Sequence, residues 1–220
     1  MNEGKLISLE GCEGSGKSSI CERLKAEFAD DPRFLLTRQP GGTKIGKQIR
    51  KILLDPENKA MAPLTELLLF YADRAQHIDE MIGSALREGK IVVSDRADSS
   101  TIAYQLFGRE RVDEWWRDAL YLVNLIWRNS DRYSNNYYDG IIYLDIDPEI
   151  GLRRRAQNVS FGESRIDDEK LEFHKRVREG FLAMSESNVL GHWRVVDASR
   201  TPDEVYADVL KIIKSISAAQ

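Results

Sequence analysis

The segment LEGCEGSGKSS, residues 9–19, combines glycines, a lysine and hydroxyl side chains at a spacing that suits phosphate binding. Gly11, Gly16, Lys17 and Ser18 fit the pattern G-x-x-x-x-G-K-[ST]. Glycines let the backbone wrap a phosphate with its N–H groups pointing inward, and a following helix adds its positive end. In this pattern the lysine reaches the β- and γ-phosphates and the hydroxyl binds Mg²⁺. The segment predicts a nucleotide phosphate site; an ordinary glycine-rich turn is the alternative.

A carboxylate and an arginine, Asp95 and Arg96, end a second apolar run, IVVSDR. An acidic residue at the end of a neighbouring strand completes such a phosphate site, because it can hold the Mg²⁺ shell. The planar guanidinium group of arginine suits a phosphate, so Arg96 suggests a second phosphorylated ligand. Arg38, after another apolar run, is carried into the same cleft. A structural Asp–Arg pair at a strand end is the alternative for Asp95 and Arg96.

The elements that must position these residues alternate along the chain. Short, continuously apolar runs predict strands at residues 5–10, 33–37, 90–95, 140–146 and 193–198. Amphipathic segments predict helices at residues 17–29, 44–54, 64–88, 111–130, 148–157, 168–187 and 202–217. This alternation predicts an α/β fold with a doubly wound, five-stranded parallel sheet. Ligands bind such sheets at the carboxyl ends of the strands, where the charged residues lie.

The chain's composition limits the class of protein. Its 220 residues are 42% hydrophobic and show no linker, so residues 1–220 are expected to form a single domain. The net charge of −4 argues against nucleic acid as a partner. No apolar run approaches the roughly 18 residues of a membrane span, and no signal peptide is evident. Two cysteines give no disulfide framework, which fits the cytoplasm.

The predicted helix at 64–88 carries two stripes of residues. Apolar residues at helical spacing predict its core face: Leu64, Leu67, Leu68, Tyr71, Ala75, Ile78 and Ile82. A displaced stripe contains Phe70, Arg74 and His77. An aromatic ring one turn before an arginine can stack on a base while the arginine bonds the base edge. Spacing alone favours the simpler alternative, in which Phe70 is peripheral core and Arg74 a surface charge.

Taken together, these segments resemble the thymidylate kinase family, the ATP-dependent dTMP kinases among the P-loop nucleoside monophosphate kinases. The resemblance is carried, in family order, by ISLEGCEGSGKSS, TRQPGGT, LLFYADRAQH, SDRADSSTIAYQLFGR, IIYLDIDPEIGLRRR and SRIDDEKLEFHKRVREGF. It implies a P-loop NTPase fold with a small helical lid at about residues 153–168, and a homodimer. It also implies phosphorylation of dTMP to dTDP by ATP with Mg²⁺, in dTTP synthesis for DNA.

The resemblance also implies roles for individual residues. The ATP-binding positions are Gly11, Cys12, Glu13, Gly14, Ser15, Gly16, Lys17, Ser18 and Ser19, and the metal-binding positions are Ser18 and Asp95. The substrate-binding positions are Glu13, Arg38, Phe70, Arg74, Arg96, Ser100, Tyr104 and Gln105. The catalytic positions are Lys17, Arg38, Asp95, Arg155 and Arg165. The lid arginine that acts on the moving phosphoryl group is not assigned among Arg153, Arg154, Arg155 and Arg165.

Within the substrate set, the resemblance divides the acceptor nucleotide among its parts. Phe70 would stack on thymine, with Arg74 at the base edge and Ser100 and Gln105 also meeting the base. Arg96 and Arg38 would hold the 5′-phosphate. Tyr104 would pack against the deoxyribose and disfavour a 2′-hydroxyl. Glu13 would lie near the 3′-hydroxyl.

Some positions depart from the family pattern. Gln39 replaces the usual glutamate of TREPGGT, and Ser164 replaces an aspartate before the lid arginine. A kinase for a modified pyrimidine monophosphate therefore stays an alternative, as does a non-catalytic nucleotide-binding regulator. The helix expected at 111–130 carries Trp115, Trp116 and Trp127, which fit packing on the sheet or a share in a dimer interface.

Overall fold

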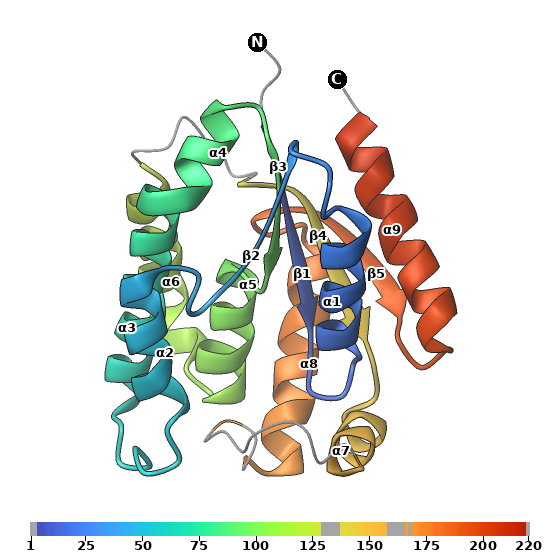
Figure 1. The fold of residues 1–220 in the computed structure, drawn as a ribbon. Helices are drawn as coiled ribbons and strands as arrows, with labels where there is room; N and C mark the ends of the chain where they lie inside the picture. Colours follow the sequence, from blue (N-terminus) through green and yellow to red (C-terminus); the bar gives the residue numbers. More distant parts are fainter. Residues whose placement is uncertain (1–3, 129–136, 158–165, 167–168, 219–220) are drawn as a thin grey trace.

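The computed structural model describes residues 4–128, 137–157, 166 and 169–218. Its five strands form one parallel sheet in the order β2-β3-β1-β4-β5, with helices on both faces (Figure 1). The strands are β1 (Lys5–Gly11), β2 (Phe34–Arg38), β3 (Ile91–Asp95), β4 (Tyr138–Asp145) and β5 (Gly191–Asp197). The predicted doubly wound five-stranded sheet is confirmed, and each predicted strand overlaps an observed one.

The helices lie between the strands, as predicted. Their bounds are α1 (Lys17–Glu27), α2 (Lys44–Leu54), α3 (Pro63–His77), α4 (Gly83–Arg87), α5 (Asp98–Thr101), α6 (Val112–Trp127), α7 (Pro148–Ala156), α8 (Leu171–Glu186) and α9 (Pro202–Ala218). Two π-helical segments, η1 (Ile78–Ile82) and η2 (Ile102–Gly108), continue α3 and α5. The predicted helix at 64–88 is therefore α3, η1 and α4 in succession.

Two apolar clusters cover the two faces of the sheet. On one face α1 and α9 bury Leu24, Val209 and their neighbours against β1 and β4. On the other face α3, α6 and α8 pack, with Trp127 and Phe181 fully buried. Figure 1 shows α1 and α9 together on one side of the strands and α3, α5 and α6 on the other. Burial on both faces explains why the central strands read as continuously apolar.

The register of the parallel strands brings the predicted charged residues together. Asp95 at the end of β3 lies beside Leu9 of β1 and beside Arg38 of β2. Gly11, which ends β1, pairs with Leu144 of β4. The carboxyl ends of β1, β2 and β3 therefore meet at one edge of the sheet, where ligands bind in folds of this kind.

The segment α5–η2 was not predicted as helical. Its sequence begins with Asp98, Ser99 and Ser100, residue types that favour caps and turns over helix interiors. The segment is nonetheless almost wholly buried, and Ser99 and Ser100 donate hydrogen bonds to the buried carboxylate of Glu10, at 2.6 and 2.5 Å. These tertiary hydrogen bonds offset the poor local helix propensity.

The predicted core stripe of the long helix is partly wrong. Leu67 and Tyr71 are buried as expected, as are Ile78 and Ile82 in η1. Leu64 and Leu68, however, are 52% and 49% exposed, and Ala75 is exposed as well. The inner face of α3 instead buries polar side chains: Glu66, Asp73, Arg74 and His77. Asp73 and Arg74 line a cavity, whereas Glu66 and His77 have hydrogen-bond partners in Gln105 and Thr37.

Two sequence-based expectations depend on parts of the chain that the structure does not describe. The lid expected at about residues 153–168 lies largely outside the described residues, and Ser164 and Arg165 lie wholly outside them. The single-domain organisation stays a prediction. Among the described residues, no helix has the length and apolar character needed to cross a membrane.

Candidate active site

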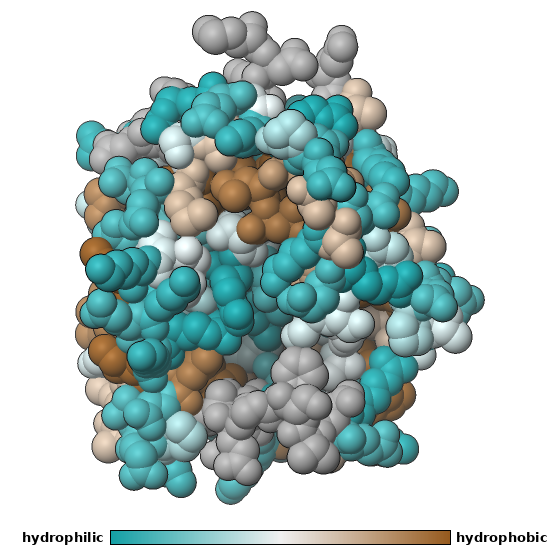
Figure 2. Space-filling view, viewed as in Figure 1, coloured by the Kyte–Doolittle hydropathy of each residue, from teal (hydrophilic) through white to brown (hydrophobic). Residues whose placement is uncertain are grey.

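One cavity of about 720 Å³ lies at the carboxyl ends of the strands. This volume is within the range of small-molecule sites, roughly 300–1,000 Å³. The centre of the face shown in Figure 2 is hollowed and surrounded mainly by hydrophilic side chains. At one end the cavity is lined by the loop of residues 12–19, and at the other by side chains of β2, α2, α3, β3, α5 and η2.

The loop between β1 and α1 has the conformation that a phosphate site requires. Gly14 and Gly16 have positive φ angles of 71° and 82°, which are costly for residues with a Cβ. Gly14 also lies against α7: a Cβ there would stand 1.9 Å from the carbonyl oxygen of Gly151. Gly11 does not line the cavity; its missing Cβ makes room for the Ser15 hydroxyl. Glycine is therefore needed at three loop positions for three different steric reasons.

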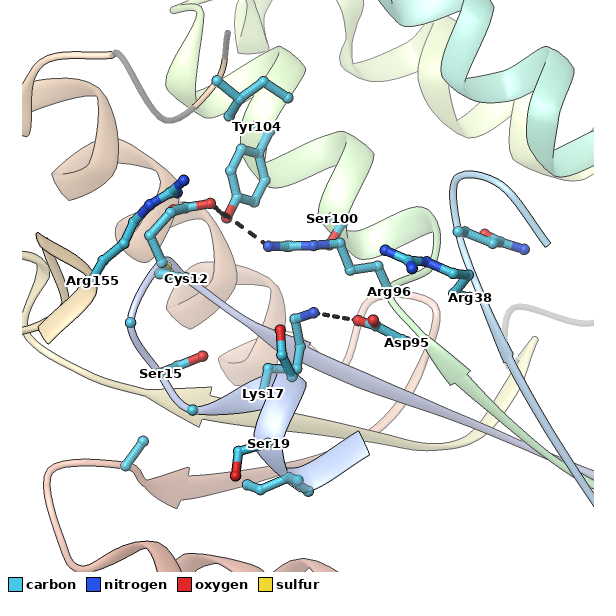
Figure 3. Close-up of a pocket in the computed structure, with 18 of the residues that line it drawn as sticks. Cys12, Ser15, Lys17, Ser19, Arg38, Asp95, Arg96, Ser100, Tyr104 and Arg155 are labelled. Carbon is cyan, nitrogen blue, oxygen red and sulfur yellow. Dashed lines mark hydrogen bonds and ion pairs between the residues drawn. The ribbon is translucent and has the colours of Figure 1, made fainter. Parts of the chain in front are cut away.

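Lys17 and Asp95 form an ion pair inside the cavity (Figure 3). Burial alone would raise the pKa of the Asp95 carboxyl, but the charges of Lys17 and Arg96 outweigh it and hold that pKa below its ordinary value. Asp95 is therefore ionised at neutral pH. Ser18 lines the same cavity, at the start of α1. A carboxylate and a hydroxyl oxygen are donors of the kind that Mg²⁺ accepts beside nucleotide phosphates.

Three arginines gather in the cavity on the side of Asp95: Arg38 from β2, Arg50 from α2 and Arg96 after β3. Burial and the nearby charge of Arg38 lower the pKa of Arg50 to about 10. Arg50 also donates a hydrogen bond to the carbonyl oxygen of Pro40, at 3.0 Å. Several guanidinium groups held together at some electrostatic cost make a strong site for an anion. Figure 3 shows Arg38 and Arg96 near the Lys17–Asp95 pair.

Arg96 has an unusual backbone conformation. Its φ angle is 71°, in the left-handed region that favours glycine. Its backbone N–H donates to the carbonyl oxygen of Leu9, at 3.0 Å, and its Nη1 donates to the hydroxyl of Ser100, at 3.1 Å. A strained non-glycine residue in a ligand cavity is typical of functional sites, where the surrounding structure maintains the strain.

Arg74 is buried, and the surface alternative for it is wrong. Only 2% of the residue is exposed. Its Nε donates to the Oε1 of Gln39, at 2.8 Å, and its Nη1 pairs with Asp98 at 3.2 Å. Its Nη2 donates to the Ala97 carbonyl oxygen and to the Thr101 hydroxyl. The guanidinium group is thus rigidly held at the cavity wall, with half-buried Phe70 lining the same wall.

Gln39, the departure from the family pattern, keeps a hydrogen bond to Arg74 without supplying a charge. Asp98 supplies a carboxylate on the other side of the guanidinium group. The charge of Arg74 therefore has a buried anionic partner even with glutamine at position 39, as buried charges require.

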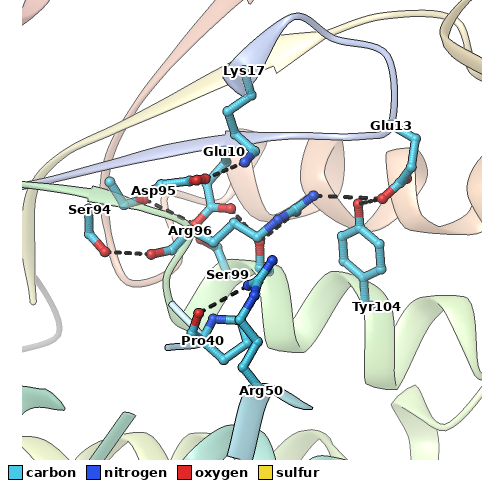
Figure 4. Close-up of polar contacts among 12 residues, drawn as sticks. Glu10, Glu13, Lys17, Pro40, Arg50, Ser94, Asp95, Arg96, Ser99 and Tyr104 are labelled. Atoms are coloured by element: carbon cyan, nitrogen blue, oxygen red, sulfur yellow. Dashed lines mark hydrogen bonds and ion pairs between the residues drawn. The ribbon is translucent and has the colours of Figure 1, made fainter. Parts of the chain in front are cut away.

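Glu13 joins the two ends of the cavity. Its Oε1 accepts a hydrogen bond from the Tyr104 hydroxyl at 2.8 Å, and Arg96 Nη2 lies 3.6 Å from the same oxygen. Its Oε2 lies 3.1 Å from Nδ1 of His174. Burial would raise the pKa of Glu13, but the hydrogen bond to His174 and the charge of Arg96 outweigh it and lower the pKa to about 2. Glu13 is therefore a carboxylate at any physiological pH. Figure 4 shows Arg96, Tyr104 and Glu13 converging.

Gln105, also on the cavity wall, is held from behind. Its Nε2 donates to buried Glu66 at 3.0 Å, and Arg109 lies 3.3 Å from the same carboxylate. Glu66 comes from α3 and Gln105 from η2, so this contact ties together two helices that line the cavity.

The lid arginines separate into different environments. Arg153 is exposed and does not line the cavity. Arg154 lines it while donating to the carbonyl oxygens of Ala198 and Ser199, and Arg155 lines it as well. Arg165 lies outside the described residues. Of the described arginines of the predicted lid, two therefore reach the cavity.

The predicted site residues among the described part of the chain, Gly11 excepted, line this one cavity. Three residues of the site region were not predicted from the sequence, namely Arg50, Thr101 and His174. Arg50 is one of several cations on α2, and nothing in the local pattern separates it from Lys47 or Lys51. His174 is the one histidine of α8, and no other metal-binding residue type lies at a metal-ligand spacing from it. Its connection to the site therefore becomes visible only through its tertiary contact with Glu13.

The arrangement is suited to bringing two phosphorylated ligands together. The glycine loop with Lys17 can bind one anion and the arginines Arg38, Arg50 and Arg96 can bind another, and Asp95 lines the same cavity. A phosphoryl group can pass between two such anions when their charges are neutralised and their oxygens lie in line.

Comparisons with known proteins give one consistent family. A family model described as "Thymidylate kinase" matches residues 9–209. The chain is 41% identical to the thymidylate kinase of Nitratidesulfovibrio vulgaris, over 97% of each chain. It is 35% identical to that of Clostridium novyi, over 97% of this chain and all of the relative. The crystal structure of thymidylate kinase from Ehrlichia chaffeensis aligns with a TM-score of 0.72 and 26% identity, covering 96% of this chain and 99% of that one.

Proposed function

The chain belongs to the thymidylate kinase family, and we propose that it transfers the γ-phosphoryl group of ATP to dTMP, giving ADP and dTDP for dTTP synthesis. The observation that carries the proposal is a cavity that joins a phosphate loop to an arginine cluster. A nucleotide-binding regulator would have no use for the second anion site. A nucleoside kinase would need a base near the attacking 5′-hydroxyl, whereas a 5′-phosphate is already anionic.

The donor end binds the ATP phosphates. The loop backbone from Gly11 to Ser18 and the amino end of α1 direct N–H groups at the β- and γ-phosphates. Lys17 leaves its contact with Asp95 to bind these phosphates, and its charge stabilises the transferred group. Arg155 lines the donor end and is the described lid arginine proposed to neutralise the moving phosphoryl group.

The acceptor end holds dTMP by its phosphate, its base and its sugar. Arg38 and Arg96 bind the 5′-phosphate, and Arg50 is added to this set because it lines the same region. Phe70 stacks on thymine while Arg74 bonds the base edge. Tyr104 packs against the deoxyribose and Glu13 accepts a hydrogen bond from the 3′-hydroxyl. Ser100 and Gln105 also contact the base.

Magnesium is the proposed metal. Ser18 and Asp95 would hold it together with ATP oxygens, because a hydroxyl and an ionised carboxylate fit its preference for hard oxygen ligands. Bound there, Mg²⁺ supplies neutralisation of the β- and γ-phosphate charge. The protein's own contribution is to hold both nucleotides in line and to keep water away from the reacting oxygens.

We also propose a homodimer and a cytoplasmic location. Large apolar side chains are exposed on α3 and α6, namely Leu64, Leu68, Tyr121 and Leu125, at 46–66%. Figure 2 shows hydrophobic patches along the edge where Figure 1 places these helices. Apolar side chains of this size favour burial against a partner. Sedimentation of the parent and of Leu68→Glu tests the dimer: the parent should sediment at twice the chain mass and the variant at the chain mass.

An ADP-release assay with ATP, Mg²⁺ and a panel of nucleoside monophosphates tests the function. Turnover should be fastest with dTMP. Turnover with dCMP, dGMP or a modified dUMP in its place would overturn dTMP as the substrate, and ADP release that no acceptor accelerates would favour a regulator.

A further inference from the structure

The Glu13 carboxylate is fixed by residues from three separate elements. Arg96 follows β3 and Tyr104 lies in η2. Both side chains approach the Oε1 of Glu13. The second oxygen, Oε2, has a different partner, Nδ1 of His174 on α8, at 3.1 Å. Both partners are shielded from water: the His174 side chain is 1% exposed and that of Glu13 is 8% exposed. Without His174, one carboxylate oxygen would lose its hydrogen bond in a buried place.

Only one ring nitrogen of His174 is engaged. Glu13 is ionised, so it can only accept, and Nδ1 must carry the proton that it donates. The other nitrogen, Nε2, is buried and has no hydrogen-bond partner among the described residues. His174 therefore acts on its surroundings through Nδ1, and its polar contact is directed at Glu13 alone.

The backbone of Glu13 is held as well, by α7. A Cβ at Gly151 of α7 would stand 2.3 Å from the Glu13 carbonyl oxygen, so loop and helix are in close contact there. With the backbone held by α7 and both carboxylate oxygens engaged, the side chain retains little rotational freedom. Each carboxylate oxygen still has a second lone pair available to an incoming hydroxyl group.

We infer that His174 is a positioning residue, which holds the Glu13 carboxylate in the orientation that receives the sugar 3′-hydroxyl of the acceptor nucleotide. This inference rests on the proposed function, in which Glu13 meets that hydroxyl. His174 is not among the residues that line the cavity, so its effect on the acceptor is indirect. Its contribution is preorganisation: the carboxylate does not have to be ordered when the acceptor binds.

Three variants of one position separate the hydrogen bond from the packing. Asparagine places an amide N–H close to the position of Nδ1, glutamine places one near Nε2, and phenylalanine keeps the ring shape without a donor. His174→Phe should raise the KM for dTMP about tenfold, the size expected when a hydrogen bond to a charged group is lost. His174→Gln should resemble His174→Phe, whereas His174→Asn should stay within about threefold of the parent. The KM for ATP should change less than twofold in all three.

The acceptor without its 3′-hydroxyl provides the decisive comparison. With 3′-deoxy-dTMP the parent and His174→Phe should have the same KM, because the hydroxyl that Glu13 receives is missing. Calorimetric titration of each variant with dTMP and with 3′-deoxy-dTMP, without ATP, measures the same difference as binding. His192→Asn, on an exposed histidine of β5, is the matched control and should behave as the parent.

A merely structural role for His174 would give a different result. Equal losses of affinity for dTMP and 3′-deoxy-dTMP, or His174→Asn as impaired as His174→Phe at equal melting temperature, would overturn the inference, as would no loss in His174→Phe. The proposed function fails separately, if the parent does not turn over dTMP. The same comparison then uses the monophosphate that the parent does turn over and the 3′-deoxy form of that nucleotide.

Discussion

The donor and acceptor ends of the cavity are built from different parts of the chain. The donor end is formed mainly by backbone, from glycines at positive φ and the amino end of α1 within residues 12–19, together with the side chains of Lys17 and Arg155. The acceptor end is made of buried side chains from β2, α2, α3, β3 and η2, which are held by one another. A backbone site depends on conformation and tolerates few Cβ atoms, whereas a side-chain site depends on the partners that hold each charged group.

The largest effect is expected from removing Lys17, the lysine of the donor end. Lys17→Ala should lower kcat/KM at least about 1,000-fold, because it removes a charge that acts on the transferred group. The melting temperature of Lys17→Ala should not fall, because the positive charge of Arg96 still lies near the Asp95 carboxylate after Lys17 is removed. Lys25→Ala, on the exposed side of the same helix, is the control. If Lys17→Ala turned over substrate at nearly the rate of the parent, Lys17 would not act on the transferred phosphoryl group, and the role proposed for the donor end would be contradicted.

The backbone character of the donor end is tested by two glycines with similar φ. Gly14→Ala meets the Gly151 carbonyl oxygen and should cost about 3 kcal/mol or more of unfolding free energy, with weaker ATP binding. Gly16→Ala meets nothing within 4 Å and should cost only the left-handed strain, about 1 kcal/mol. Urea unfolding measures both. Equal costs would show that contact with α7 does not shape the loop.

At the acceptor end, Arg96→Ala should raise the KM for dTMP about 100-fold, since it removes a guanidinium–phosphate contact. The KM for ATP should change less than threefold. Arg117→Ala, an exposed arginine of α6, serves as the control. Steady-state kinetics with each substrate varied in turn measures the split, and equal losses for both nucleotides would contradict a separate acceptor end.

The smallest effect concerns His77, which supports the acceptor end from behind through a 2.7 Å contact between its Nε2 and the Thr37 hydroxyl. Burial and the charge of Arg74 lower the pKa of His77 to about 4, below its ordinary 6.5. Between these values the unfolded chain binds the proton and the folded chain does not, so stability falls as the pH drops. The expected loss from pH 6.5 to 4.5 is about 2 kcal/mol.

His77→Gln provides the comparison, because its amide can reach the position of Nε2 without titrating. Its unfolding free energy should fall by about 2 kcal/mol less than that of the parent over the same pH range. Parallel pH curves for the two proteins would refute a neutral, buried His77.

The donor end was predictable from sequence because its determinants are local. Gly16, Lys17 and Ser18 are adjacent, and the apolar run before them and the helix after them complete the mechanism. The sheet was predictable for a related reason: strands buried on both faces have few polar residues, and the pattern is visible in each strand alone.

The acceptor end was only partly predictable, because its determinants are tertiary. Spacing placed Arg74 at the surface, but buried Asp98, remote in sequence, compensates its charge. Leu64 and Leu68 fit a helical core stripe, yet the inner face of α3 buries Glu66, which pairs with Gln105 of η2 and with Arg109 just after it. A residue's own neighbours in the sequence do not reveal a partner of this kind. The resemblance to a family supplied the roles that spacing could not.

The left-handed backbone of Arg96 has a consequence for protein engineering. At φ 71° an L-residue costs about 1–2 kcal/mol, and glycine would remove that cost. Glycine at position 96 would remove this backbone cost, but it would also take the cation away from buried Glu13 and remove the guanidinium group proposed to bind the acceptor phosphate. Thermostability screens of this protein should hold position 96 constant, since the residue that the backbone favours there differs from the one that the ligand requires.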